Sequence, residues 1–221
     1  MDPEGFQSLE GILPSTRCDA LARGTGLIPG ARYRAGARHL MGHPAIAELA
    51  SDKSLLQIAR LWVGPGAVPY RATLFDKSAR RNWLVVWHQD TALPLEEHND
   101  LPEWGPWSAK GGVNYAHAPA WALSRIVALR IHLDASTVEN GPLKVIPGSH
   151  AAGVLSDEEV FRAARDRAPI EGVVGRGGVL AMRPLLIHSS SKARIPQPRR
   201  VLHLEYAASL DLAPGIRLAV T

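Results

Sequence analysis

Cysteine is almost absent from this 221-residue chain, because Cys18 is its only thiol. An intramolecular disulfide bond and a zinc site built on cysteines are therefore excluded. Long apolar runs are missing as well, since no stretch reaches the roughly 18 residues that a membrane-spanning helix requires. The opening segment contains acidic side chains and no apolar core, so it does not resemble a secretory signal. We therefore expect a soluble, cytoplasmic protein with no membrane association.

A concentration of positive charge is also absent. Lysine and arginine number 25 against 21 aspartate and glutamate residues, which gives a net charge of +4 and a pI near 9.5. A nucleic-acid-binding surface needs clustered basic residues, whereas here they are spread along the chain. We therefore expect no nucleic-acid partner, and the modest excess is better suited to drawing a small anionic molecule into a cleft. No feature of the sequence indicates an oligomeric state.

What is present is the composition of an ordinary globular domain, with 46% hydrophobic and 21% charged residues. We expect a single domain over residues 1–221, with a helical N-terminal part up to about residue 65. Between residues 43 and 62 the apolar side chains recur mostly at helical spacing, and Ser51 with Asp52 interrupts the pattern. Two short helices are therefore predicted there.

From about residue 66 to 210 the pattern changes to that of strands. Short apolar segments rich in β-branched residues are bounded by Gly, Pro, Asn or Asp. They predict strands at residues 68–75, 83–90, 125–134, 141–150, 177–183 and 199–207. A separate helix at 156–168 begins with a Ser-x-x-Glu capping box. Many short strands with helices around them predict a mainly β fold with flanking helices, a jelly-roll or cupin-like barrel.

A histidine and an aspartate stand two residues apart in the segment WHQD, residues 87–90. On a strand such residues face the same side, so His88 and Asp90 can point at one metal ion. A third ligand must come from elsewhere in the chain. The best candidate is His188, which follows a predicted strand, and His132 competes with it. Two histidines and one carboxylate form the ligand set of non-haem Fe(II) oxygenases.

An arginine also follows His188 in the sequence. Arg199 lies 11 residues after His188 and opens the apolar segment 199–207. Such an arginine can reach into a barrel and hold a carboxylate with two parallel hydrogen bonds. Because neighbours on a strand face opposite sides, only one of Arg199 and Arg200 can lie on the metal's side. Ser190 could add a hydroxyl to the same carboxylate.

In their order along the chain, these residues resemble the phytanoyl-CoA dioxygenase family of Fe(II)/2-oxoglutarate oxygenases. The resemblance spans roughly residues 70–206 and rests on LFDK (74–77), WHQD (87–90), NGPLKVIPGSH (140–150), His188, Ser190 and Arg199. It implies a double-stranded β-helix with Fe(II) on His88, Asp90 and His188. It also implies 2-oxoglutarate as cosubstrate, with the C5 carboxylate on Arg199, and hydroxylation of a C–H bond with release of succinate and CO2. Related halogenases lack the carboxylate ligand, so Asp90 favours hydroxylation.

Three further positions have two readings each. Arg130, in the predicted strand 125–134, either meets an anionic group of the cosubstrate or substrate or forms a structural salt bridge. Thr73 stands where the family places a strand residue beside 2-oxoglutarate, and it either contacts that molecule or lines the barrel. His150 closes a motif with two turn signals, and it is better explained as a loop residue than as a metal ligand.

The segment from residue 93 to 119 shows little regular pattern and is too long for a simple hairpin connection. Because it follows Asp90 directly, we expect it to leave the barrel beside the metal and to form a lid. Trp107, Lys110 and His117 are its candidate substrate contacts. The alternative is a packed surface loop whose tryptophans, including Trp104, cover the outside of the barrel.

Two other classes of protein would fit the predicted barrel. A cupin-like metalloenzyme that does not use 2-oxoglutarate would keep the metal site but have no use for Arg199. A non-catalytic binding barrel would need neither the metal site nor the arginine. Iron content and succinate formation by the purified protein distinguish the three, and no motif names the small-molecule substrate.

Overall fold

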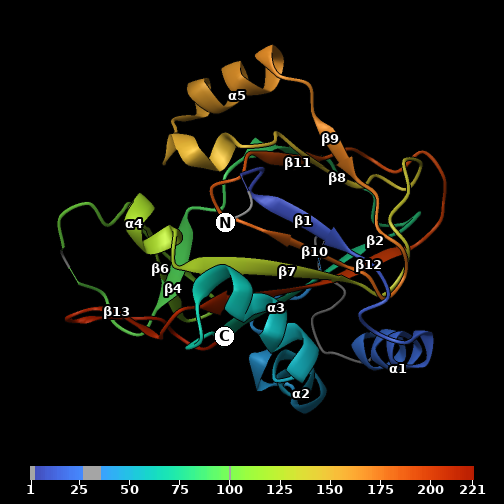
Figure 1. The fold of residues 1–221 in the computed structure, drawn as a ribbon, viewed down its shortest axis with the longest axis horizontal. Coiled ribbons are helices and arrows are strands. Elements are labelled where there is room, and N and C mark those ends of the chain that lie inside the picture. Colours follow the sequence, from blue (N-terminus) through green and yellow to red (C-terminus); the bar gives the residue numbers. More distant parts are fainter. Residues whose placement is uncertain (1–2, 27–35, 100) are drawn as a thin grey trace.

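Two antiparallel β-sheets face each other, and helices cover their outer sides (Figure 1). The computed structural model describes residues 3–26, 36–99 and 101–221. The first sheet has the order β1 (Phe6–Leu9), β10 (Val179–Met182), β7 (Ile126–His132), β12 (Arg199–Ala207) and β2 (Val68–Lys77). The second sheet has the order β3 (Val85–His88), β11 (His188–Ser190), β8 (Leu143–Val145) and β9 (Ile170–Gly172). This is a jelly-roll arrangement, and it confirms the predicted fold class.

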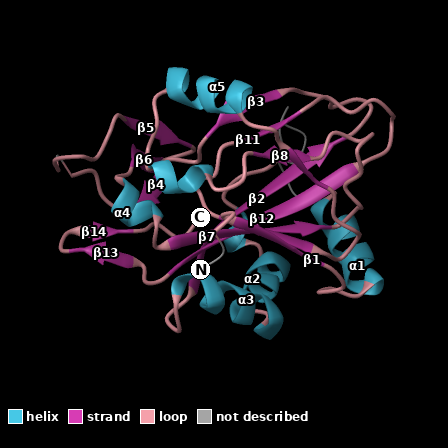
Figure 2. Cartoon of the chain, turned by 45° about the horizontal axis from the view of Figure 1, so that its top comes forward, coloured by secondary structure: helices cyan, strands magenta, loops and turns pink. Residues whose placement is uncertain are grey.

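The first sheet is covered on its outer face by α1 (Ser15–Thr25), α2 (Pro44–Ala50) and α3 (Lys53–Val63) (Figure 2). Along β12, the apolar residues Leu202, Leu204 and Tyr206 pack toward these helices. Alternation along the strand then turns Arg199 and His203 toward the space between the two sheets. Arg199 and His203 of β12 therefore face the interior of the barrel.

The two short helices expected between residues 43 and 62 are confirmed, and the break between them has a local cause. Asp52 lies just before α3 and accepts a hydrogen bond from the Ser54 amide at 2.9 Å. An aspartate at this position satisfies a backbone donor that the first helical turn leaves without a partner. The polar pair Ser51 and Asp52 therefore ends one helix and begins the next.

The second sheet carries α5 (Asp157–Asp166) on its outer face (Figure 2). The predicted capping box is present, because the Ser156 hydroxyl accepts from the Glu159 amide and the Glu159 carboxylate accepts from the Ser156 amide. Val160 packs the helix against Ile146 and Ile187 below it. The helix predicted at 156–168 is therefore confirmed, with a slightly earlier end.

One prediction about regular structure was incomplete and one was wrong. The N-terminal part contains a strand besides its helices, because β1 pairs with β10 along the first sheet. The segment 93–119 is not an irregular loop, since it forms a three-stranded sheet of β4 (Ala92–Leu95), β6 (Val113–His117) and β5 (Trp107–Lys110). Its strands were missed because they are short and because Pro94 interrupts β4, which an edge strand tolerates.

One sequence signal did mark this small sheet. Gly111 and Gly112 form the two-residue turn between β5 and β6, and both have positive φ angles, +59° and +81°. A two-residue hairpin turn with positive φ at both positions favours glycine, because side chains rarely adopt that conformation. The Gly-Gly pair is therefore the feature that predicts a hairpin here.

The remaining elements are short. They are α4 (Ala120–Leu123), the 3₁₀ helices η1 (Leu40–Gly42) and η2 (Ser149–Ala152), and the hairpin of β13 (Asp211–Ala213) and β14 (Ile216–Arg217). Within the described parts of the chain, no helix combines the length and the apolar character needed to cross a membrane.

Candidate metal and cosubstrate site

His88, Asp90 and His188 come together at one end of the second sheet. His88 ends β3 and His188 begins β11, and the two residues are direct partners across these antiparallel strands. One Asp90 carboxylate oxygen lies 3.7 Å from His88 Nε2, and the other lies 3.5 Å from His188 Nε2. The three donor atoms all lie within 4.8 Å of one another. In the described residues this is the one group of three or more such side chains close enough to hold a metal ion.

The backbone aims both imidazole rings. His88 Nδ1 donates to the Val86 carbonyl at 2.8 Å, and His188 Nδ1 donates to the Leu186 carbonyl at the same distance. A hydrogen bond at Nδ1 leaves the lone pair on Nε2, which is the form of histidine that binds a metal. Asp90 lies beyond the end of β3, where its amide donates to the Pro184 carbonyl at 2.9 Å. The predicted pairing of His88 with Asp90 therefore holds although Asp90 is not itself a strand residue.

The protonation states also suit a metal. Burial lowers the pKa of His188 to about 3, although Asp90 acts in the opposite direction, so this imidazole is neutral at physiological pH. Partial burial alone would raise the pKa of Asp90, but His188 and His88 beside it hold that pKa well below its usual range. The site therefore offers a neutral ring and an ionised carboxylate, which are the states in which these groups coordinate metals.

A cavity between the two sheets connects this triad to Arg199. Ten residues line it: Phe75, Trp83, Val85, His88, Asp90, Arg130, Leu143, His188, Ser190 and Arg199. The second sheet contributes the histidines, while the first sheet contributes both arginines. Asp90 is the only acidic residue that the described part of the chain contributes to this lining. The site is therefore bounded by a metal-binding group on one wall and by two cations on the other.

Arg199 is buried, and some of its N–H donors have no hydrogen-bond partner in the described residues. Its Nη2 donates to the Ser190 hydroxyl at 3.3 Å, whereas its Nε and Nη1 have no hydrogen-bond partner among the described residues. Burial, together with the neighbouring Arg130, lowers the pKa of Arg199 to about 9. Buried polar groups normally have partners, because an unsatisfied one costs free energy. A carboxylate in the cavity would satisfy the free donors and offset the charge.

Arg200 faces the other way, as alternation along the strand predicts. Its Nε and Nη2 donate to the two carboxylate oxygens of Asp134, each at 2.7 Å. This two-pronged pair lies away from the cavity. The prediction that only one of the two arginines lies on the metal's side is therefore confirmed, and that residue is Arg199.

Ser190 and Arg130 both line the cavity. The Ser190 hydroxyl donates to the Gly141 carbonyl at 2.9 Å, so its proton is already in use. Arg130 lies 3.1 Å from His203 Nδ1 and 5.1 Å from the centre of the Phe75 ring, and burial lowers its pKa to about 10. No carboxylate pairs with Arg130 in the described parts of the chain, which leaves it available to an anionic molecule.

The other candidates lie outside the triad. Thr73 is buried, and its hydroxyl has no partner among the described residues, but it is not among the cavity-lining residues. His132 does not join the metal-binding group, since its Nδ1 lies 2.9 Å from the Ser136 hydroxyl. His150 lies in η2 against Gly5, where an added Cβ would come within 2.3 Å of the imidazole.

The predicted substrate contacts lie on the small sheet beyond Asp90. His117, at the end of β6, lies 2.7 Å from the Thr91 hydroxyl, next to Asp90 in the chain. Lys110, at the end of β5, lies 5.1 Å from the centre of the Tyr115 ring. Trp107 packs edge-on against His98, with ring centres 4.2 Å apart. These three residues remain candidates, and Lys110 and His117 are exposed enough to meet a ligand.

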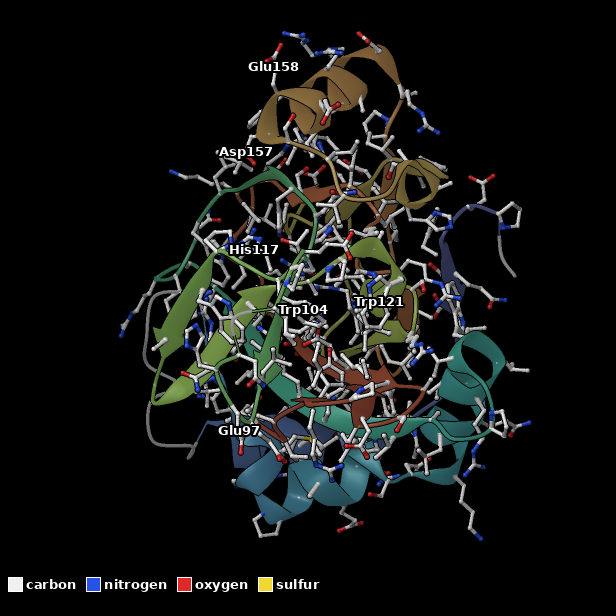
Figure 3. The ribbon with its side chains drawn as sticks, turned by 90° about the vertical axis from the view of Figure 1, so that its left-hand side faces the viewer. Glu97, Trp104, His117, Trp121, Asp157 and Glu158 are labelled. Atoms are coloured by element: carbon white, nitrogen blue, oxygen red, sulfur yellow. The ribbon has the colours of Figure 1, made fainter. Side chains whose placement is uncertain are left out.

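Trp104 has a structural role instead. It is buried in a core cluster with Leu93 and Leu95 and packs edge-on against Trp121, with ring centres 6.1 Å apart. Figure 3 shows the two tryptophans together, with His117 apart from them. The small sheet thus packs on a core of its own, and its hairpin end carries the exposed Lys110.

One residue of the site was missed. Lys77, the last residue of β2, is fully buried and donates from Nζ to the Ser190 hydroxyl at 2.9 Å and to the Ser191 carbonyl at 2.6 Å. It stands in the LFDK segment, where a lysine at the end of an apolar strand is the only visible signal. The residues that surround it come from distant parts of the sequence.

The order of these residues agrees with a known family. Residues 1–201 match the model of the family described as phytanoyl-CoA dioxygenase (PhyH). The chain belongs to the phytanoyl-CoA dioxygenase family. Among related proteins, an L-proline trans-4-hydroxylase of Streptomyces griseoviridis is 30% identical over 188 residues, which cover 72% of this chain and 62% of that protein. An ectoine dioxygenase of Sphingopyxis alaskensis is 24% identical over 187 residues, which cover 75% of this chain and 54% of that protein.

Solved structures of other proteins show the same fold. The structure of EctD from S. alaskensis with 2-oxoglutarate and 5-hydroxyectoine aligns with a TM-score of 0.69 at 22% identity, covering 94% of this chain and 73% of that one. The carbocyclase SnoK from nogalamycin biosynthesis aligns with a TM-score of 0.69 at 18% identity, covering 95% and 81%. This phytanoyl-CoA dioxygenase family member spans 54% to 62% of the length of its curated relatives.

Proposed function

We propose that this protein is an Fe(II)- and 2-oxoglutarate-dependent oxygenase that hydroxylates a C–H bond of a small molecule and releases succinate and CO2. The observation that carries the proposal is a single cavity that joins the His88–Asp90–His188 group to the free donors of Arg199. A metal site alone would not require a buried arginine. A buried guanidinium without a counterion is costly, so its presence beside the triad supports an anionic cosubstrate.

The donor set fits Fe(II). Two imidazole nitrogens and one carboxylate oxygen would bind one face of the ion and leave its other positions open. Iron together with bound 2-oxoglutarate supplies the oxidising chemistry for attack on a C–H bond. Because Asp90 fills the place that halogenases leave to a halide, hydroxylation is the proposed outcome.

The chain's own residues bind and orient. Arg199 would hold the C5 carboxylate of 2-oxoglutarate through the nitrogens that now lack partners, and Arg130 adds a second cation to the same wall. Other parts of the cavity wall are apolar and are formed by residues such as Phe75 and Leu143. Such walls exclude water from the reacting groups, which strengthens every electrostatic contact inside.

The substrate is proposed to be a small anionic molecule that enters past the hairpin of β5 and β6. Arg71 and Lys110 lie 5.2 and 5.1 Å from the centre of the Tyr115 ring. Partial burial and the neighbouring Arg38 and Arg71 lower the pKa of Lys110, and no acidic side chain pairs with it in the described residues. Cations gathered beside an active site attract anions and raise their local concentration.

The proposal is tested with the purified protein loaded anaerobically with Fe(II). We expect about one iron per chain and 2-oxoglutarate-dependent succinate formation that increases when the right substrate is added from a panel of paired anionic and neutral small molecules. Iron binding without any succinate would indicate a cupin-like metalloenzyme that does not use 2-oxoglutarate. Absence of both would indicate a non-catalytic binding barrel.

A further inference from the structure

We propose that Lys77 is a positioning residue of the cosubstrate subsite, which sets the Ser190 hydroxyl and thereby the orientation in which Arg199 meets a dicarboxylate. The inference rests on the proposed function, because it concerns the same cavity. It adds a residue that does not line this cavity and that acts through a neighbour.

The position of Lys77 in the fold is the first observation. On neighbouring strands, Lys77 and Arg199 are direct partners, at the end where β2 and β12 meet the second sheet. The Lys77 side chain has no exposed surface, and its Nζ lies 5.4 Å from the centre of the Trp83 ring. No acidic side chain pairs with this ammonium group in the described residues. The amino group of Lys77 is therefore sealed behind the cavity wall, and its hydrogen-bond acceptors in the described residues are neutral.

The hydrogen bonds around Ser190 give the second observation. A serine hydroxyl can donate once and accept twice. The Ser190 hydroxyl donates to the Gly141 carbonyl at 2.9 Å and accepts from Lys77 Nζ at 2.9 Å and from Arg199 Nη2 at 3.3 Å. All its capacity is thus in use. Lys77 and Gly141 together fix the oxygen that holds one corner of the Arg199 guanidinium, while its Nε and Nη1 remain free.

Gly141 shows how closely this corner is packed. Its φ angle is +70°, and an added Cβ would lie 2.4 Å from the Ser191 carbonyl oxygen and 3.2 Å from Lys77 Nζ. The turn that begins the segment 140–150 therefore packs directly on the lysine and its second acceptor, Ser191. This gives the glycine of that motif a physical reason, since a side chain there would displace the groups that position Ser190.

Electrostatics explains why the arrangement suits a dicarboxylate. Burial, and in the same direction the neighbouring Arg199 and Arg130, lower the pKa of Lys77 to about 7. Lys77 thus lies behind a cavity wall that carries Arg199 and Arg130, and the acidic side chain that the described residues contribute to this lining, Asp90, belongs to the metal-binding group. An apolar residue at position 77 would avoid this cost. A carboxylate bound at Arg199 would offset it, because opposite charges favour the charged form of each.

The experiment compares the wild-type protein with Lys77→Met, Ser190→Ala and the double variant. Fe(II)-loaded protein is titrated with 2-oxoglutarate under anaerobic conditions in a calorimeter, and the KM for 2-oxoglutarate and kcat are measured separately. We expect Lys77→Met to weaken 2-oxoglutarate binding about tenfold, the loss expected for a hydrogen bond that involves a charged group. Iron content and kcat at saturating 2-oxoglutarate should be largely retained. Lys144→Met is the matched control, because Lys144 is a partly exposed lysine of β8 that pairs with Glu171.

Positioning through Ser190 has a signature that a structural role lacks. If Lys77 acts through the Ser190 hydroxyl, the double variant should bind 2-oxoglutarate no more weakly than whichever single variant has the lower affinity. The two substitutions then remove the same contact, so their effects do not add. Unchanged affinity in Lys77→Met, or strictly additive losses, would overturn the inference. Should Lys77→Met fail to fold, normal affinity in Ser190→Ala would overturn it alone. Failure of the wild-type protein to bind 2-oxoglutarate would instead refute the proposed function.

Discussion

The two ends of the barrel interior are both cationic, yet they are built differently. At the inner end, Lys77 and Arg199 are buried and face each other across two long strands. At the outer end, Arg71 pairs with Glu205 at 3.1 Å, and Lys110 lies on an exposed hairpin over Tyr115. The inner end is thus held by strand pairing between distant segments, while the outer end depends on a local turn.

The difference matches the two kinds of molecule that the ends are proposed to bind. Along β2 and β12 the pair Arg199–Lys77 and the pair Glu205–Arg71 are separated by six residues, roughly 20 Å of strand. His203 lies between them, and both His203 and Arg71 lower the pKa of Asp90, which places the triad within electrostatic reach of the outer end. An inner end held by paired strands suits a cosubstrate that is always the same molecule. A hairpin at the outer end can change its shape to suit a substrate without disturbing the inner end.

The largest effect is expected where the two ends meet. Asp90→Asn keeps the shape of the side chain but removes the negative charge that a divalent ion requires. Iron affinity should therefore fall by more than about 100-fold, which exceeds the loss usual when a residue that only hydrogen-bonds a metal ligand is changed. Iron content after dialysis measures this change. Asp211→Asn, at an exposed acid that pairs with Arg217, should bind iron normally. Full iron occupancy in Asp90→Asn would remove Asp90 from the metal site.

The inner end is tested by an adjacent pair of arginines. Arg199→Lys keeps the positive charge but loses the planar fork, so the KM for 2-oxoglutarate should rise at least several-fold, in line with the roughly 1.5–3 kcal/mol of a charge-assisted contact. Arg200→Lys is the matched control, since Arg200 binds Asp134 away from the cavity. An unchanged KM in Arg199→Lys would transfer the role to Arg130, the other cation of the lining.

The residues of the candidate site differ in how far the sequence alone predicts them. His88 and Asp90 follow from alternation in one short segment, and Arg199 is separated from Arg200 by the same rule. The third ligand does not follow from spacing, because the pairing of His188 with His88 is a contact between strands far apart in the sequence. Its place after the predicted strand 177–183 favoured His188 over His132, and the resemblance to a family then strengthened that choice.

Lys77 and the small sheet were missed for different reasons. The contacts of Lys77 come from Gly141, Ser190 and Ser191, which only the folded chain brings together. No local pattern reveals such an environment. The hairpin at Gly111 and Gly112, by contrast, carried a local signal, but the irregular stretch before it hid the short strands on either side.

The outer end is tested by Lys110→Ala. Removal of this exposed ammonium should raise the KM for an anionic substrate a few-fold, because an exposed charged contact contributes roughly 1 kcal/mol or less. Iron binding and the affinity for 2-oxoglutarate should not change, since Lys110 is not among the residues that line the cavity. Lys53→Ala, at the start of α3 on the opposite side of the first sheet, is the control. A loss of 2-oxoglutarate affinity in Lys110→Ala would contradict the separation of the two ends.

The last prediction concerns the protonation of the inner end without cosubstrate. Lys77 has a pKa of about 7 in the folded chain and an ordinary value of 10.5. Between these two values the unfolded chain binds a proton that the folded chain does not, so the free energy of unfolding should rise with pH from 7 toward 10.5. Below pH 7 both states carry the proton and this contribution no longer changes. Urea unfolding at several pH values should therefore show a steeper rise in the wild-type protein than in Lys77→Met. Saturating 2-oxoglutarate should reduce the difference, because a bound carboxylate favours the charged lysine. Parallel pH profiles of the free energy of unfolding in the two proteins would show that Lys77 keeps its proton when no cosubstrate is bound. The lysines of the inner and outer ends would then differ in burial but not in protonation.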